Sequence, residues 1–134
     1  MRTEPRIYFE TARRYLEAAK VVFQPDDYWE VIYFLCYHSF ESLACAGLRQ
    51  RRNEIPSQHT AKIKAFKNLY RRASFYNEIR LCAQRVPVSQ REWALYPRVS
   101  GFAFVTPASR FDRPIALNAI RCVDRLFSRM ESEF

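Results

Sequence analysis

The sequence contains very little glycine and is short of acidic residues. Glycine occurs only twice in 134 residues, at positions 47 and 101. An all-β domain normally places more glycine in its turns, so the composition favours helices. Asp and Glu total 14 against 22 Lys and Arg, which leaves a formal net charge of +8 at pH 7. This balance argues against an acidic or disordered chain, because apolar residues also reach 49%.

Motifs for metal binding or disulfide formation are missing as well. The four cysteines, Cys36, Cys45, Cys82 and Cys122, form no CxxC pair, and each lies among apolar residues at helical spacing. Such cysteines behave as small hydrophobic residues, and free thiols are typical of a reducing compartment. Because the sequence has only two histidines besides, we expect no metal site and no cofactor.

The sequence also has no long hydrophobic run. Its first residues, MRTEPR, do not resemble a signal peptide, and the apolar run from Val31 to Tyr37 is too short to cross a membrane. We therefore expect a soluble, cytoplasmic protein that does not associate with membranes. The length fits a single domain, residues 1–134, which is large enough to be stable without disulfides or a metal.

What the sequence has in quantity is arginine. Lysine occurs only at positions 20, 62, 64 and 67, so most of the positive charge is carried by guanidinium groups. The planar guanidinium donates two parallel hydrogen bonds to phosphate, which makes RNA, DNA or a nucleotide the natural class of ligand. The alternative is that the basic surface only keeps the protein soluble.

Apolar residues recur with helical period along most of the chain, which predicts an all-α protein. We expect an antiparallel up-and-down bundle of four to five helices. The second helix should run from about Tyr28 to Leu48 after a cap at Asp26 or Asp27, and should end near Gly47. The remaining predicted helices start near Pro5, at His59 or Thr60, near Ser74, at a capping box formed by Ser89 and Glu92, and at Asp112 with Pro114.

Two segments depart from the amphipathic pattern. The start of the second helix, from Tyr28 to Cys36, is apolar on most of its circumference, which is typical of a central helix or a subunit interface. We therefore expect a homodimer that uses the second or the last helix. The stretch between Pro97 and Pro114 is the one long irregular segment, and we expect this 97–113 loop to be functional or mobile.

Several segments resemble the HEPN family of helical domains associated with nucleotides and RNA. The segment from Tyr37 to Leu48, YHSFESLACAGL, is similar to the signature helix of that family. The His59-Thr60 pair after a proline, the segment REWALYP from Arg91, and the last helix from Ala116 to Met130 follow in the family's order. Together these pieces cover about Tyr8 to Met130.

The resemblance implies a helical bundle that often dimerises, with a ligand groove near the dimer cleft. Many members of the family are metal-independent ribonucleases with an Arg-x4-6-His motif. Others are inactive binding domains, or partners of small nucleotidyltransferases in toxin–antitoxin pairs.

This sequence departs from the family motif at its histidine. Arg91 is followed after four residues by Tyr96, and a tyrosine of pKa about 10 is a poor base near neutral pH. Arg52 and His59 fit the spacing Arg-x6-His but lie on either side of Pro56, where the resemblance does not place the site. We therefore expect a catalytically inactive domain that binds RNA or a nucleotide-bearing partner. The alternatives are a helical partner of a nucleotidyltransferase and a metal-independent ribonuclease.

The binding residues predicted from the sequence lie in three groups. Arg91, Tyr96 and Arg98 combine guanidinium groups with an aromatic ring, a grouping that can hold a phosphate and stack a base. His38 and Glu41 are three residues apart on one helix and face the same side, either as part of a ligand groove or as hydrogen-bonded core residues. The third group is a stripe of arginines along the last helix, Arg121, Arg125 and Arg129. This stripe either binds phosphates or is simply a solvated face.

Overall fold

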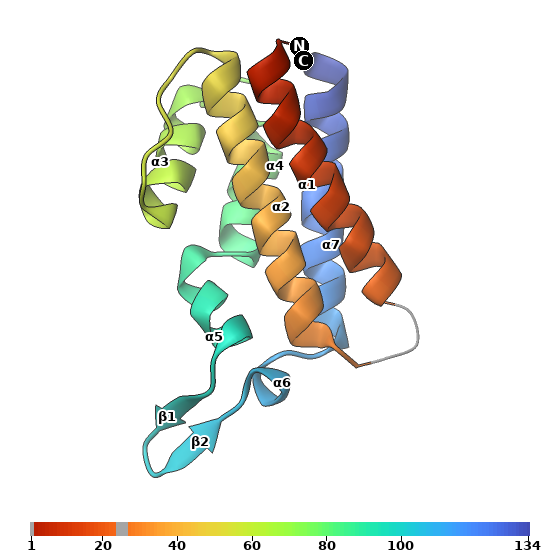
Figure 1. The fold of residues 1–134 in the computed structure, drawn as a ribbon, viewed down its shortest axis with the longest axis vertical. Helices are drawn as coiled ribbons and strands as arrows, with labels where there is room; N and C mark the ends of the chain where they lie inside the picture. Colours follow the sequence, from red (N-terminus) through yellow and green to blue (C-terminus); the bar gives the residue numbers. More distant parts are fainter. Residues whose placement is uncertain (1, 24–26) are drawn as a thin grey trace.

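Long helices packed side by side make up the body of the protein, and a small β-hairpin extends from one end (Figure 1). The computed structural model describes residues 2–23 and 27–134. About 74% of the chain is helical, which confirms the predicted all-α class, and the sheet is no larger than a hairpin. The elements in chain order are α1 (Thr3–Val22), α2 (Trp29–Gln50), α3 (His59–Leu69), α4 (Tyr76–Arg85), the 3₁₀ turn η1 (Val88–Gln90), α5 (Arg91–Leu95), β1 (Arg98–Ser100), β2 (Ala103–Val105), α6 (Pro107–Arg110) and α7 (Arg113–Glu133).

Helix α2 lies at the centre of the bundle, as predicted from its apolar surface. It contacts α1, α3, α5, α6 and α7. Figure 1 shows α1 and α2 running in opposite directions, whereas α3 runs in the same direction as α2 because the connection over residues 51–58 returns along the bundle. This return places the start of α3 beside the middle of α2, which positions the site described below.

By length and composition alone, α2 could cross a membrane. In the fold, 72% of its most hydrophobic stretch of 18 residues is buried inside the protein, as is common for the core helix of a soluble domain. Its first turns are only partly covered, because Tyr28 and Val31 remain 53% and 40% exposed. The expected homodimer stays a prediction.

The predicted end of α2 near Gly47 is wrong. The helix continues through Gly47 to Gln50 and ends where Arg52 adopts a left-handed backbone conformation with φ of 60°. The amide of Asn53 donates to the carbonyl of Leu48, and the amide of Arg52 donates to that of Arg49, the hydrogen-bond pattern of a Schellman motif. Gly47 is used for close packing instead, since the ring of Phe66 occupies the space that a side chain would need.

The predicted helix starts have mixed outcomes. Asp112 caps α7 as expected, because its carboxylate accepts a hydrogen bond from the amide of Ile115 at 2.9 Å. The capping box of Ser89 and Glu92 is wrong: Ser89 lies inside η1, and α5 starts after Gln90 without a side-chain cap. The start of α3 at His59 is confirmed.

Two other predicted starts shift. Helix α4 begins at Tyr76 rather than at Ser74, after an uncapped Phe75. Of the two possible caps of α2, Asp26 lies outside the described residues, and Asp27 precedes an N-cap at Tyr28 that has no side-chain hydrogen bond.

The 97–113 segment is not wholly irregular, which corrects the sequence-based expectation. Strands β1 and β2 form an antiparallel hairpin in which Arg98 pairs with Val105, and Gly101 provides the left-handed turn with φ of 64°. The chain then returns to the bundle, where the buried ring of Phe111 lies 4.6 Å from that of Tyr33. The hairpin tip keeps its apolar side chains exposed, Phe102 above all.

The four cysteines are free and buried, as expected from their spacing. Burial raises the pKa of the Cys45 thiol to about 11 and that of the Cys36 thiol further, so these groups stay protonated at neutral pH. They act as small core residues.

Candidate functional site

A buried carboxylate, that of Glu41, is the centre of a polar cluster between α2 and α3. The Tyr37 hydroxyl donates to its Oε2 at 2.6 Å, and Nδ1 of His59 lies 2.7 Å from the same oxygen. The ammonium group of Lys62 donates to Oε1 at 2.9 Å. Glu41 is 8% exposed, so the two oxygens are bound almost entirely by protein groups.

The hydrogen bonds determine the charge of Glu41. Burial by itself would raise the pKa of its carboxyl group, since a charged form is disfavoured away from water. The hydrogen bonds from Tyr37, Lys62 and His59 together outweigh burial and hold the pKa below its ordinary value. Burial and the bond to Glu41 raise the pKa of Tyr37, so its hydroxyl stays a donor. Glu41 is therefore an ionised acceptor that orients its neighbours.

The helices place these residues by simple periodicity. Tyr37 and Glu41 are four residues apart on α2, and His59 and Lys62 are three residues apart in the first turns of α3. Such pairs lie on one face of a helix. The two faces meet because the 51–58 connection brings the start of α3 back along α2.

His38 lies beside this cluster in an aromatic setting. Its ring stacks on Tyr15 at 5.1 Å between centroids and meets the ring of Phe34 edge-on at 4.4 Å. Burial lowers the pKa of His38; Glu41 opposes this effect, whereas the nearby charge of Arg91 adds to it. His38 is thus a half-buried, mainly neutral imidazole at neutral pH, held by ring contacts.

Arg91 reaches the same place from the start of α5. Its guanidinium carbon lies 5.9 Å from the centroid of the Phe34 ring. Its positive charge partly opposes the rise in the pKa of Tyr37 and adds to the lowering of the pKa of His38. The Nε atom of Arg91 is buried and has no hydrogen-bond partner among the described residues. A buried N–H group without a partner costs roughly 1–3 kcal/mol, and the Nε atom of Arg49 is buried without a partner in the same way.

Arg98 and Tyr96, which the sequence analysis groups with Arg91, have surroundings of their own. Arg98 forms an ion pair with Glu92, and its guanidinium carbon lies 4.9 Å from the centre of the Trp93 ring. Tyr96 is 61% exposed and, in the part of the chain that the structure describes, makes no side-chain hydrogen bond. The contacts of Arg91 are with the residues around His38 instead.

His59 is hydrogen-bonded to Glu41, a contact that its position after Pro56 in the sequence does not predict. Within the described ranges, Arg52 has no contact with His59, and its backbone ends α2. Lys62 was missed altogether, although its spacing of three residues from His59 on a predicted helix was a usable signal.

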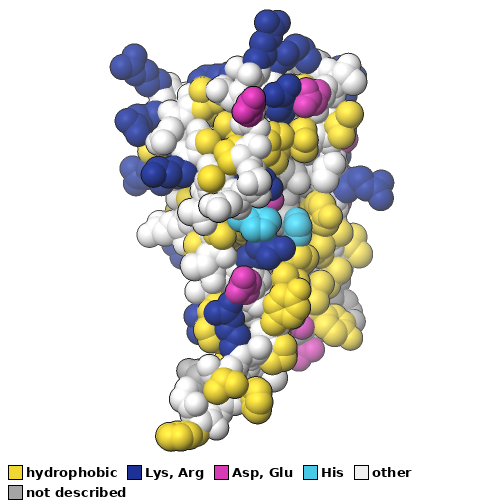
Figure 2. All heavy atoms as spheres, turned by 60° about the vertical axis from the view of Figure 1, so that its left-hand side comes forward, with side chains coloured by type: hydrophobic (Ala, Val, Ile, Leu, Met, Phe, Trp, Pro, Cys, Tyr) yellow, Lys and Arg dark blue, Asp and Glu magenta, His cyan; other side chains and the backbone are white. Residues whose placement is uncertain are grey.

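Figure 2 shows the histidine side chains next to each other on one face of the molecule, with basic, acidic and hydrophobic side chains around them. The electrostatic interaction with His59 also lowers the pKa of His38, which agrees with a short distance between the two rings. We call the residues His38, Glu41, His59, Lys62 and Arg91 the polar cluster. Among residues 2–23 and 27–134, no group of three or more His, Cys, Asp or Glu side chains is arranged to hold a metal ion.

The fold and this site define a basic, all-α domain with imidazole, ammonium and guanidinium groups arranged around one buried carboxylate. In comparisons with known proteins, no family model, no curated protein and no solved structure matches the chain.

Proposed function

We propose that this protein binds single-stranded RNA, with a phosphate held at the polar cluster. The observation that carries the proposal is the position of the Arg91 guanidinium group, which lies beside the Phe34 ring and close enough to His38 to lower its pKa. A guanidinium group forms strong, often paired hydrogen bonds with phosphate oxygens, so this group is suited to hold a phosphate at the cluster.

The charge around the cluster supports an anionic ligand. Glu41 is paired with Lys62, the charge of Arg91 acts on the neighbouring Tyr37 and His38, and the whole chain carries a net charge of +8. Long-range attraction of this kind is independent of nucleotide sequence and weakens as salt rises. The resemblance to the HEPN family points to the same class of ligand and remains a prediction.

Aromatic rings next to the cluster favour a single strand over a duplex. His38 is already stacked on Tyr15, and the half-buried ring of Phe34 lies between His38 and Arg91. Bases can stack on such rings only when they are not paired within a helix.

The test is fluorescence anisotropy with a labelled single-stranded RNA at two salt concentrations. We expect wild-type binding to weaken steeply with salt, and Arg91→Ala to lose about 1–3 kcal/mol of binding free energy. Arg80→Ala is the matched control, because it removes one exposed arginine from α4 that belongs to none of the predicted binding groups. Equal losses in the two variants would show that Arg91 is only one of many diffuse charges and would contradict the proposed site.

The contact between Glu41 and His59 supports a second function, metal-independent cleavage of the bound RNA. Glu41 holds Nδ1 of His59 at 2.7 Å, which leaves Nε2 of this part-exposed ring as the proton acceptor. In this reaction Nε2 takes the proton of a ribose 2′-OH and the 2′-oxygen attacks the adjacent phosphorus. The bond from phosphorus to the 5′-oxygen breaks, the leaving oxygen takes a proton from water, and a 2′,3′-cyclic phosphate results.

Cleavage is tested with the same RNA in EDTA, with separation of products on a gel. If His59 is the base, wild type yields 2′,3′-cyclic ends, and His59→Ala removes activity while retaining RNA binding. Glu41→Gln should lower the rate by about 10²–10⁴-fold, since it removes the carboxylate that orients the imidazole. Intact RNA after incubation with wild type would leave the protein as a binding domain, as the missing motif histidine predicts.

A further inference from the structure

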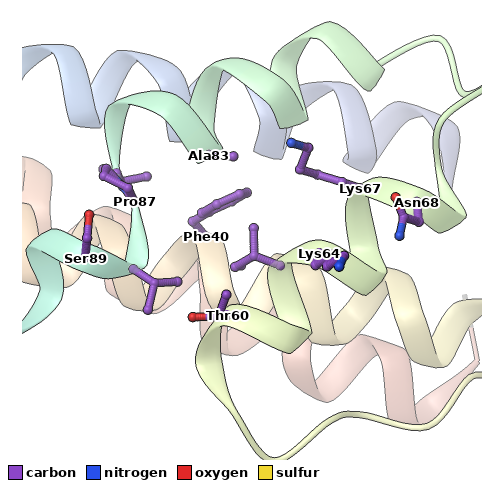
Figure 3. Close-up of a pocket in the computed structure, with 11 residues that line it drawn as sticks. Phe40, Thr60, Lys64, Lys67, Asn68, Ala83, Pro87 and Ser89 are labelled. Atoms are coloured by element: carbon purple, nitrogen blue, oxygen red, sulfur yellow. The ribbon is translucent and has the colours of Figure 1, made fainter.

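A pocket of about 500 Å³ opens between α3, the end of α4 and η1, next to the polar cluster. Figure 3 shows the ring of Phe40 pointing into its centre, with Lys64, Lys67 and Asn68 on one side and Pro87 and Ser89 on the other. The volume lies within the range of roughly 300–1,000 Å³ that is common for small-ligand sites. We call it the α3–α4 pocket.

The chemistry of the pocket differs between its floor and its rim. The floor is apolar and built from buried side chains, among them Phe40, Ile63 and Val86. The rim carries the ammonium groups of Lys64 and Lys67, which are three residues apart on α3 and so lie on one face. An apolar, aromatic floor beside two cations fits a flat ring that bears a negatively charged group.

Polar groups at the rim could recognise the edge of such a ring. Thr60 and Ser89 carry hydroxyl groups, each able to donate and to accept a hydrogen bond. The side-chain oxygen of Asn68 accepts a hydrogen bond from Arg71 at 3.1 Å, which orients the amide and assigns its NH₂ group as the donor for a ligand.

The pocket and the polar cluster are built from neighbouring residues of the same segments, although none of the five residues of the polar cluster lines the pocket. Thr60 follows His59 directly in α3, and Ser89 in η1 precedes Arg91, the first residue of α5, by two residues. Thr60 and Ser89 line the same pocket, so two separate segments of the chain contribute residues to both places.

From this arrangement we infer that the α3–α4 pocket takes one unstacked base of a single-stranded RNA, while Lys64 and Lys67 bind the phosphate beyond it. This inference rests on the proposed function and adds to it a second subsite, with a base as its occupant. Only a strand whose bases are free to turn outward could fill both places, which excludes duplex RNA.

The test compares two labelled RNA probes, a normal single strand and a strand of the same length with an abasic backbone. Both are about ten nucleotides long, which is within the usual range for single-strand sites. Wild type should bind the normal strand at least fivefold more tightly, since only that strand offers a base to the pocket. Ala83→Trp, which fills the pocket from α4, should weaken binding of the normal strand and leave binding of the abasic strand unchanged. Ala108→Trp places the same ring at an exposed site on α6 and should leave the affinities for both strands unchanged.

A charge-matched pair of double variants tests the same pocket and does not depend on whether Ala83→Trp folds. Lys64→Gln with Lys67→Gln should weaken binding of the normal strand about tenfold more than Arg72→Gln with Arg80→Gln, although each pair removes two exposed or partly exposed charges. Equal binding of both probes by wild type, with the expected salt dependence, would contradict the inference that the pocket takes a base. The proposed function would still stand. If neither probe showed salt-dependent binding, the proposed function itself would be overturned.

Discussion

Gly47 of α2 and Phe66 of α3 are in direct contact: a Cβ atom at position 47 would lie 2.5 Å from Cε1 of the Phe66 ring. The ring is fully buried and packs against Tyr70 at 5.3 Å, so it has little room to move. The hydroxyl of Tyr70 also donates to the carbonyl of Gly47 at 2.7 Å. This close approach holds α3 against α2 and, with it, the positions of His59 and Lys62.

The substitution Gly47→Ala should destabilise the protein by about 1–3 kcal/mol, because the added methyl group overlaps Phe66. Helix propensity alone predicts the opposite sign, a gain of up to about 1 kcal/mol for alanine within a helix. Urea denaturation of both proteins measures the difference in free energy of unfolding. In a Phe66→Leu background, Gly47→Ala should lower the free energy of unfolding by less than it does in wild type. An equal loss in both backgrounds would show that the contact with the Phe66 ring is not the cause.

Arg52→Gly should stabilise the protein, by about 0.5–1 kcal/mol. Arg52 is in the left-handed conformation that ends α2, where a side chain is strained and glycine is favoured. Thermal unfolding measures the gain as a higher midpoint temperature. Asn53→Gly is the control, because Asn53 has no positive φ and should lose stability instead. A large loss of RNA binding in Arg52→Gly would contradict the structural role assigned to this residue.

Glu41→Gln should lower the free energy of unfolding by about 2–3 kcal/mol near pH 7, since the neutral amide loses charged hydrogen bonds to Lys62 and His59. The pKa of Glu41 is lower in the folded protein than its ordinary value of 4.5, so the unfolded chain binds more protons in acid. The stability that the carboxylate contributes is present above about pH 4.5 and is lost as the pH falls through the folded pKa.

The corresponding measurement is urea denaturation of wild type and Glu41→Gln at several values from about pH 7 down to pH 4. The difference between the two proteins should narrow toward the acid end. A difference that stayed constant with pH would mean that the charge of Glu41 does not contribute to stability. Ser42→Ala, at the next position of α2, controls for substitution within this helix.

The elements that could be predicted from the sequence are those specified by neighbouring residues. The stripes of apolar residues, the cap at Asp112 and the start of α3 at His59 depend on contacts within a few positions of the chain. The ends of helices were predicted less well, because Gly47 and Ser89 carry signals that tertiary packing uses for other purposes. At position 47 the signal for a helix end was really a requirement for space beside Phe66.

The sequence by itself determined the helical class, the basic charge and the candidate side chains His38, Glu41 and Arg91. Only the tertiary structure decided which of them meet. Glu41 and His59 are 18 residues apart and become partners because the 51–58 connection returns α3 along α2. Arg98, only six residues from Glu92, forms an ion pair with it beside Trp93 instead of joining Arg91. Spacing along the chain specifies which residues share a face of one helix. The site forms where faces of different helices pack together, and this packing depends on the whole core.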